Sequence, residues 1–463
     1  MMKNKSDYKS ITLDSDNSVF GTTADGQRVI VDKQTRFGVF HTYSYRPILK
    51  GTEEMLTPKH GEEVLVKMRN VDITYGSGLK AFRAIKDLSL NIYKGEVLGL
   101  VGESGSGKST TGKALVGLIP YSHGDIQLLN KTLPKKLKRG LKFGEALKEY
   151  KAIENFLVNK VQMIFQDPAN SLNPHVNVEK VVSEGLENTK NAKEIYLYNI
   201  DQDVLKETFA RISAKGKKET FTKELFNELN RKVAIDEHVG YKTLYEEFEP
   251  MLVNEPTAHE YLLSTKAHRD TEMQYSEKEC KRILVKEILK SVGLDESVLP
   301  RYPLEFSGGQ QQRIGISRAV VLRPQLLVAD EPISALDVSI QAQVVNIFNE
   351  LKEKFDLTIL FIAHDLRMVE YISDRIAVMN KGVLLEVGKT EEIINHSLHP
   401  YTKSLLDAVP SIDSEKGSLV GYVYDPSMHN YSEEVQPEWV KINDDHYVLG
   451  TPEEVEQWKQ GKY

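Results

Sequence analysis

The chain has 463 residues, of which 40% are hydrophobic and 27% are charged, proportions that suit a soluble globular protein of two or three domains. No stretch approaches the roughly 18 consecutive apolar residues of a membrane-spanning helix, and the first residues lack the apolar core of a secretory signal, so we expect a cytoplasmic protein. A single cysteine, Cys280, excludes an internal disulfide and a cysteine-ligated cluster, and the net charge of −7 argues against a dedicated nucleic-acid binder.

Residues 1–62 are polar, with scattered apolar positions, and we interpret them as an N-terminal extension. Short apolar runs begin at residue 64. The runs at 97–101, 326–329 and 358–363 are continuous, which is typical of strands buried on both faces. An α/β fold is therefore expected.

Each of these three runs ends in a residue that can take part in phosphate chemistry. The first ends at Gly102, the second at Asp330 and Glu331, and the third at His364. Ligands of an open parallel sheet bind outside the carboxyl ends of its strands, so the three ends predict a single site.

The segment after the first run is a glycine-rich phosphate-binding pattern. Its glycines let backbone N–H groups converge on a polyphosphate, Lys108 reaches the outer phosphates, and the Ser109 hydroxyl is a ligand for Mg²⁺. Residues 113–116 can continue a helix, as the motif requires. ATP and Mg²⁺ are thus the expected ligands, bound by Gly102, Glu103, Ser104, Gly105, Ser106, Gly107, Lys108, Ser109 and Thr110.

The carboxylates after the second run have separate predicted roles. Asp330 is expected to be a second contact to Mg²⁺, and Glu331 is placed to polarise an attacking water. With Lys108 they predict an ATPase.

Residues 188–279 are heavily charged and carry apolar residues at helical spacing, for example Leu205, Phe209 and Ile212. They predict a small helical insertion that packs on itself. The basic run at residues 135–139 is expected to be a solvated face, with contact to anionic lipid headgroups as the alternative.

A second anion-binding end is predicted where Ser307, Gly308, Gly309 and Gln310 precede a helix from Gln311 toward Val321. A chain with this element and a phosphate loop resembles the nucleotide-binding domain of ATP-binding cassette (ABC) proteins. The resemblance implies a P-loop NTPase fold with a helical subdomain, to which the insertion is added. It also implies a head-to-tail dimer, in which the Ser-Gly-Gly-Gln element closes on ATP held by the other subunit.

Other positions match this family residue by residue. Tyr75 corresponds to the aromatic residue that stacks on adenine, the alternative being a core tyrosine at a strand end. Gln166 matches the glutamine that reaches magnesium and couples to the membrane partner. Asp337 lies in the loop that crosses the dimer, and His364 matches the histidine that contacts the terminal phosphate.

Four further segments resemble the ATPase subunits of bacterial oligopeptide and dipeptide importers, namely residues 171–174, 333–345, 361–366 and His399-Pro400-Tyr401-Thr402. Of the two paralogous ATPases in such importers, the chain is similar to the F-type subunit. The resemblance implies a paralogous ATPase partner, two transmembrane permease subunits, an extracellular peptide-binding protein, and a peripheral location on the cytoplasmic face of the membrane.

The resulting domain division has five parts. They are an extension at 1–62, the first part of the ATPase domain at 63–187, the insertion at 188–279, the second part of the ATPase domain at 280–398, and a C-terminal tail of oligopeptide-importer type at 399–463.

Three alternatives stay open at this stage. Nickel and oligosaccharide importers share the same ATPase pattern. A soluble ABC ATPase acting on ribosomes or nucleic acid usually carries two cassettes, whereas this chain has one phosphate loop. An inactive binding module is disfavoured because Lys108, Asp330, Glu331 and His364 are all present.

Overall fold

The computed structural model describes residues 11–14, 20–24, 26–36, 40–59, 61–137, 144–167, 171–189, 192–214, 220–233, 237–408, 423–432 and 435–463. Two residues of the basic run, Lys138 and Arg139, lie outside this set. The chain divides into two compact units, the first made of residues 1–168 and 323–463, and the second of residues 169–322.

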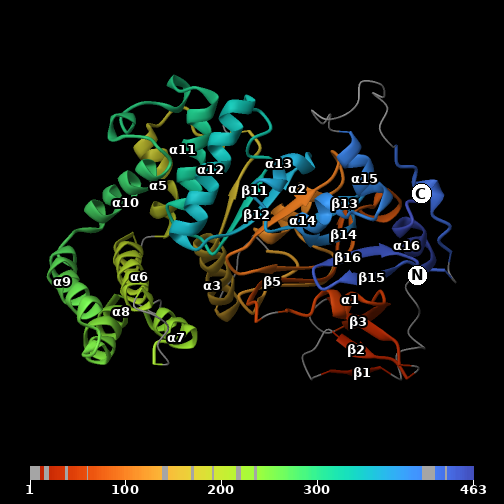
Figure 1. Ribbon diagram of the computed structural model, residues 1–463, viewed down its shortest axis with the longest axis horizontal. Coiled ribbons are helices and arrows are strands. Elements are labelled where there is room, and N and C mark those ends of the chain that lie inside the picture. Colours follow the sequence, from red (N-terminus) through yellow and green to blue (C-terminus); the bar gives the residue numbers. More distant parts are fainter. Residues whose placement is uncertain are drawn as a thin grey trace. The chain divides into compact units, whose positions relative to one another are not determined.

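The strands of the described residues all belong to the first unit (Figure 1). Their bounds are β1 Thr12–Leu13, β2 Phe20–Thr22, β3 Arg28–Arg36, β4 Phe40–Pro47, β5 Val64–Tyr75, β6 Phe82–Tyr93, β7 Val97–Val101, β8 His123–Leu128, β9 Lys131–Thr132, β10 Val161–Ile164, β11 Leu326–Asp330, β12 Thr358–Ala363, β13 Arg375–Asn380, β14 Val383–Lys389, β15 Glu438–Asn443 and β16 His446–Gly450.

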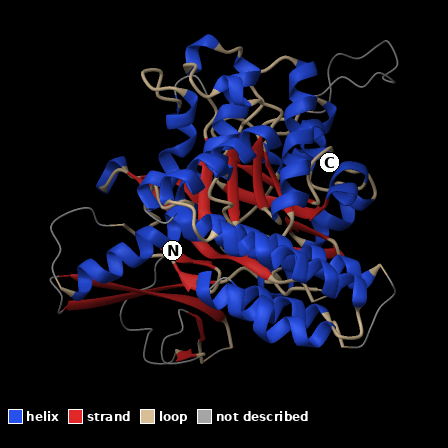
Figure 2. Cartoon of the chain, turned by 90° about the vertical axis from the view of Figure 1, so that its left-hand side faces the viewer, coloured by secondary structure: helices blue, strands red, loops and turns tan. Residues whose placement is uncertain are grey.

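The largest sheet has eight strands in the order β10-β11-β12-β7-β13-β14-β16-β15, and its strands lie side by side near the middle of Figure 2. The first five are parallel to one another, and the last three continue the sheet with antiparallel pairing. Every residue of β7, β11 and β12 is buried, as the continuous apolar runs predicted. These apolar strands form the centre of the core.

Strands β11, β12 and β7 are parallel neighbours, with Val328 opposite Leu360 and Leu360 opposite Leu98. Their carboxyl ends therefore meet at one edge of the sheet. The predicted convergence of three strand ends is confirmed by this pairing, and the α/β fold class is confirmed with it.

Two smaller antiparallel sheets complete the first unit, with the orders β6-β5-β8-β9 and β1-β2-β3-β4. The second of these lies within the predicted N-terminal extension. Its strand β4 is tied to β5 by Arg46, which donates to the Asp72 carboxylate at 2.8 Å and to the Asn70 carbonyl at 3.0 Å. The Trp439 N–H also donates to the Lys50 carbonyl at 2.9 Å, so the extension contacts the C-terminal hairpin β15–β16.

Among the residues that the structure describes, the α-helices of the first unit are α1 Thr52–Met55, α2 Lys108–Leu115, α3 Glu145–Lys160, α12 Val338–Phe355, α13 Leu366–Glu370, α14 Thr390–Asn395, α15 Pro400–Asp407 and α16 Pro452–Lys459. Those of the second unit are α5 Val178–Thr189, α6 Ala192–Ser213, α7 Lys223–Val233, α8 Glu237–Lys242, α9 Pro256–Glu272, α10 Glu277–Ser291 and α11 Gly308–Val320. A π-helical turn at Thr243–Phe248 and short 3₁₀ turns connect some of them.

The predicted insertion is helical in its described part and has a core of its own. Leu205, Ile212, Leu229, Leu244 and Phe248 are buried together there. The proposed limits at 188 and 279 fall inside α5 and α10, because these two helices extend beyond the segment whose composition differs.

Arg269 of α9 and Asp201 of α6 form a fully buried ion pair within this bundle. The guanidinium donates from Nε to Oδ1 at 2.7 Å and from Nη2 to Oδ2 at 2.9 Å, and both side chains are 0% exposed. The pair thus joins α6 to α9 inside the bundle.

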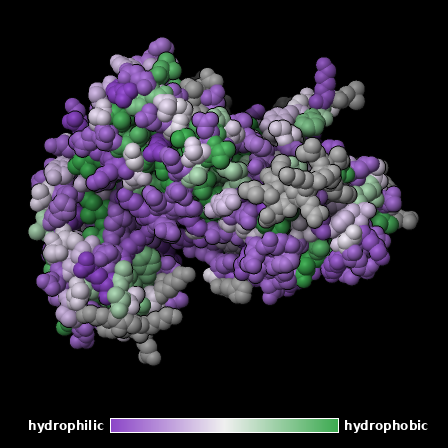
Figure 3. Space-filling view, turned by 45° about the horizontal axis from the view of Figure 1, so that its top comes forward, coloured by the Kyte–Doolittle hydropathy of each residue, from purple (hydrophilic) through white to green (hydrophobic). Residues whose placement is uncertain are grey.

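No helix in the described part of the chain is both long enough and apolar enough to cross a membrane. The face drawn in Figure 3 is mainly hydrophilic, and its hydrophobic residues lie in scattered spots.

The substitution Arg269→Met should destabilise the insertion by about 3–5 kcal/mol, because the Asp201 carboxylate would be left buried without its charged partner. The double substitution Arg269→Met with Asp201→Leu should recover most of that loss. Urea unfolding followed by circular dichroism measures both, and equal stability of the single variant and the parent chain would contradict this assignment.

Candidate functional site

The loop that follows β7 has a backbone conformation that only glycine adopts freely. Gly102 has φ of 151° and Gly107 has φ of 104°. A Cβ on Gly102 would lie 2.0 Å from the Met379 carbonyl oxygen, and a Cβ on Gly107 would lie 2.4 Å from Ile85 Cδ1. Both glycines are therefore required for the loop to turn tightly over the end of the sheet.

Lys108 is the first residue of α2 and is only 4% exposed. Its Nζ donates to the carbonyl oxygens of Gly102 at 2.6 Å and Glu103 at 2.9 Å, so the ammonium group lies within the loop. Burial lowers the Lys108 pKa, and the nearby Glu331 and Asp330 carboxylates oppose that shift. Within the described part of the chain no side chain caps the N-terminus of α2, so its N–H groups and the Lys108 ammonium group suit a polyphosphate.

Ser109 and Asp330 connect the loop to the end of β11. The Ser109 hydroxyl donates to Asp330 Oδ1 at 2.6 Å, and Asp330 is 4% exposed. Burial raises the Asp330 pKa, while the hydrogen bond from Ser109 lowers it. A hydroxyl beside a carboxylate provides the hard oxygen atoms that Mg²⁺ prefers, so this pair fits the metal.

Glu331 follows directly and has φ of 46°, a left-handed conformation uncommon outside glycine. Its Oε2 accepts a hydrogen bond from Gln166 Nε2 at 3.1 Å and lies 3.4 Å from His364 Nδ1. These residues follow β10, β11 and β12, three adjacent parallel strands. The strand order thus brings together a carboxylate, an amide and an imidazole that are far apart in the sequence.

Tyr75 ends β5 and is 44% exposed, which is not the burial of a core tyrosine. Its phenol oxygen lies 3.5 Å from Thr110 Oγ1 in the first turn of α2. The exposed ring is thus close to the phosphate loop.

The Ser307–Gln310 element belongs to the second unit, where Ser307 is the N-cap of α11. The Gln310 N–H donates to Ser307 Oγ at 3.4 Å, and the Ser307 N–H donates to Gln310 Oε1 at 3.2 Å. The sequence predicts that this helix begins at Gln311. It begins earlier, at Gly308, because the reciprocal hydrogen bonds make Ser307 the N-cap residue. Asp337, in the first unit, is the exposed N-cap residue of α12.

The structure adds Tyr401, a residue for which the sequence pattern predicts no role. The Tyr401 phenol oxygen accepts a hydrogen bond from the Glu103 N–H at 2.9 Å. The sequence pattern marks the His399-Pro400-Tyr401-Thr402 segment, but it does not predict that this segment contacts the phosphate loop.

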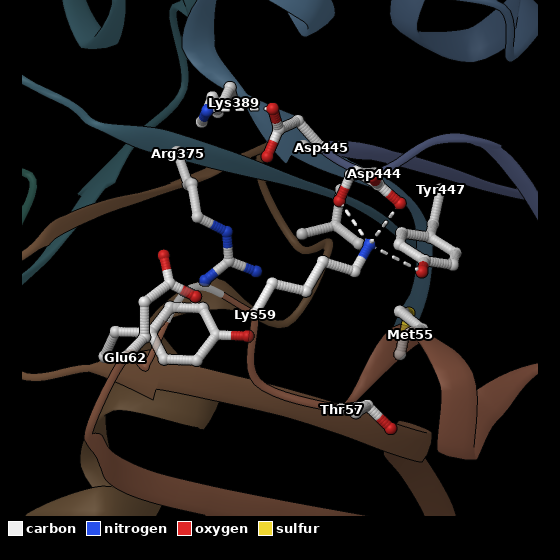
Figure 4. A pocket seen from close by; sticks show the side chains of 12 residues that line it. Met55, Thr57, Lys59, Glu62, Arg375, Lys389, Asp444, Asp445 and Tyr447 are labelled. Atoms are coloured by element: carbon white, nitrogen blue, oxygen red, sulfur yellow. Dashed lines mark hydrogen bonds and ion pairs between the residues drawn. The ribbon is translucent and has the colours of Figure 1, made fainter.

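A separate cleft of the first unit is lined by residues of the extension, β13, β14 and the C-terminal hairpin (Figure 4). Lys59 points to Tyr447 and Asp444 there, donating to the phenol oxygen at 2.9 Å, and Lys389 pairs with Asp445 at 2.8 Å. Because its cations are neutralised by carboxylates, this cleft is unlike a phosphate site.

A glycine-rich loop between a buried parallel strand and a helix, with a hydroxyl–carboxylate pair and a second carboxylate at the end of β11, defines a P-loop ATPase. The model of the family described as "ABC transporter" matches residues 85–334. The model described as "Oligopeptide/dipeptide transporter, C-terminal region" matches residues 385–430. The chain belongs to the ABC transporter family and is an ATP-binding ATPase, as predicted.

Curated relatives support the same family over most of the chain. The oligopeptide transport ATP-binding protein AmiF of Streptococcus pneumoniae is 37% identical over 401 residues, covering 86% of this chain and 99% of the relative. The dipeptide transport ATP-binding protein DppF of Lactococcus lactis is 40% identical, with 86% and 97% covered. The oligopeptide transport ATP-binding protein OppF of Bacillus subtilis is 36% identical, with 87% and 98% covered.

Replacing Lys108 with Met should weaken ATP binding about 10- to 100-fold, because a charge-assisted hydrogen bond to phosphate contributes roughly 1.5–3 kcal/mol. Titration with a fluorescent ATP analogue measures the loss. Lys290→Met, at an exposed lysine of α10, is the matched control and should bind as the parent does. Equal affinities of the two variants would show that Lys108 does not contact the nucleotide.

Proposed function

We propose that this chain is the ATP-hydrolysing subunit of a bacterial importer that takes up oligopeptides or dipeptides through separate membrane subunits. The ATP-hydrolysing part of this proposal rests on one observation, the grouping of Glu331, Gln166 and His364 beside the Ser109–Asp330 pair. The peptide part is supported by relatives that are named as oligopeptide or dipeptide transport ATP-binding proteins.

In this proposal ATP binds along the loop and α2. The loop N–H groups other than that of Glu103, which bonds Tyr401, hold the phosphates together with the Lys108 ammonium group, and the exposed Tyr75 ring stacks on adenine. Ser109, Asp330 and Gln166 would hold Mg²⁺. That ion neutralises charge on the outer phosphates when it is bound.

Hydrolysis depends on the residues around Glu331. The carboxylate accepts a proton from the attacking water, and the Gln166 amide fixes its orientation through the 3.1 Å hydrogen bond. We assign His364, 3.4 Å from the same oxygen, to donate a hydrogen bond toward the terminal phosphate. The left-handed backbone at Glu331 is a strained conformation of the kind that clusters at active sites.

The two anion-binding ends imply how the subunit assembles. We propose that Ser307, Gly308, Gly309 and Gln310 contact ATP held by a paralogous ATPase subunit, and that Asp337 lies at the same contact. Two transmembrane permease subunits and an extracellular peptide-binding protein complete the proposed importer, with this chain on the cytoplasmic face of the membrane. Bridging two sites per nucleotide can supply the roughly 10⁴-fold preference that drives an equilibrium from 1:99 to 99:1.

The variant Glu331→Gln should retain ATP binding and lose about 10²- to 10⁴-fold in ATPase rate, because the amide cannot accept the proton of the attacking water. Cells carrying this variant should lose uptake of a labelled peptide. Fluorescent-nucleotide titration, phosphate release and uptake assays measure the three effects.

Parallel uptake assays with labelled nickel and a labelled oligosaccharide separate the importer classes. Loss of peptide uptake alone supports the proposal. Loss of nickel uptake alone or of sugar uptake alone would show that the imported substrate is nickel or an oligosaccharide instead. Unchanged uptake of all three substrates would argue for an ATPase that does not serve transport.

The variant Ser109→Ala should raise the Mg²⁺ concentration needed for half-maximal ATPase activity, because one oxygen ligand of the ion is lost. Binding of ATP in the presence of EDTA should change much less, since the loop N–H groups and Lys108 remain. An unchanged Mg²⁺ requirement would show that Ser109 is not a ligand.

A further inference from the structure

The peptide group between Gly102 and Glu103 is held from both sides. Its carbonyl oxygen accepts from Lys108 Nζ at 2.6 Å, and its N–H donates to the Tyr401 phenol oxygen at 2.9 Å. The position of the Lys108 ammonium group therefore depends on the orientation of a peptide group that also bonds Tyr401.

Tyr401 is itself rigidly placed. It lies in the first turn of α15 and is 1% exposed. Its ring packs against Tyr424 with the centroids 5.4 Å apart. Burial raises the pKa of its phenol to about 12, so the group stays neutral at physiological pH.

His399, two positions before Tyr401, is the N-cap residue of α15. His399 Nδ1 accepts the Tyr401 N–H at 3.1 Å, and burial lowers the His399 pKa to about 3, which keeps the imidazole neutral and able to accept. His399 packs against Trp458 of α16, with the ring centroids 5.2 Å apart.

A buried carboxylate of the large sheet holds the segment before α15. Glu386 of β14 is 0% exposed and accepts the N–H groups of Leu398 at 2.7 Å and His399 at 3.3 Å. It also hydrogen-bonds His446 of β16 at 2.7 Å. Side chains from β14, β16 and α16 thus fix the position from which Tyr401 reaches the loop.

We propose that Tyr401 is a positioning residue for ATP binding: its phenol oxygen orients the Gly102–Glu103 peptide group, and with it Lys108, so that the phosphate loop is preformed. The inference rests on the proposed function, because the ligand of the loop is ATP. It assigns to the C-terminal segment a direct effect on nucleotide affinity.

The test uses Tyr401→Phe in the full chain, which keeps the ring and removes only the phenol oxygen. The Kd for a fluorescent ATP analogue and the KM for ATP should rise about 2- to 10-fold, the effect expected for one neutral hydrogen bond. The kcat should stay unchanged, because a loss of uniform binding acts on KM alone.

Tyr424→Phe is the matched control, because it removes a phenol oxygen of the same aromatic group, one that bonds His429 Nε2 at 2.9 Å instead of the loop. Its Kd and KM should equal those of the parent chain, and thermal unfolding should show both variants folded. A parent-like Kd for Tyr401→Phe, or an equal rise in both variants, would overturn the inference.

Hydrogen exchange provides a second measurement on the parent chain without nucleotide. The Glu103 amide should exchange slowly although its loop is exposed, and fast exchange there would also refute the role of Tyr401. If the parent chain binds no ATP at all, the proposed function fails, whereas the exchange rate still tests the Tyr401 contact.

Discussion

The parallel pairing of β7 with β12 and of β12 with β11 is the constraint on which the site depends. It places Gly102, Asp330 and His364 at the same edge of the sheet, although more than two hundred residues separate the first from the others. The Ser109–Asp330 hydrogen bond then joins the segment after β7 to the end of β11, and the contacts of Glu331 span adjacent strand ends. A shift of one strand by one residue would turn these side chains to the opposite face.

The apolar composition of those strands and the polarity of their ends act together. Buried strands of Val, Leu, Ile and Phe make the edge rigid, and this rigidity lets a buried Asp330 and a left-handed Glu331 persist in spite of their cost. The same sheet extends through β14 and β16, so its far strands hold the C-terminal segment whose Tyr401 returns to the loop. The phosphate loop and the C-terminal segment are therefore held by the same sheet.

The second unit differs from the first in how it is stabilised. Its insertion buries apolar stripes within a helical bundle and contains the Arg269–Asp201 pair, so it is specified by its own core. The Ser307–Gln310 capping box likewise forms from local residues alone. Local determination of this kind explains why the helical character of the insertion could be predicted from spacing. The helix after the Ser307–Gln310 element was also predicted, although it begins at Gly308 and not at Gln311, whereas the π-helical turn at Thr243–Phe248 was not predicted.

The sequence alone indicated the family, the three central strands and the chemical character of their ends, because glycine at a tight loop, continuous apolar runs and adjacent carboxylates are local signals. It also named Lys108, Ser109 and Glu331 as candidates. Only the tertiary structure decided that Gln166 and His364 meet at one oxygen of Glu331, and that Tyr401 reaches the Glu103 N–H. Such contacts join residues up to 298 positions apart, and their geometry follows from strand order and packing, which no short pattern encodes.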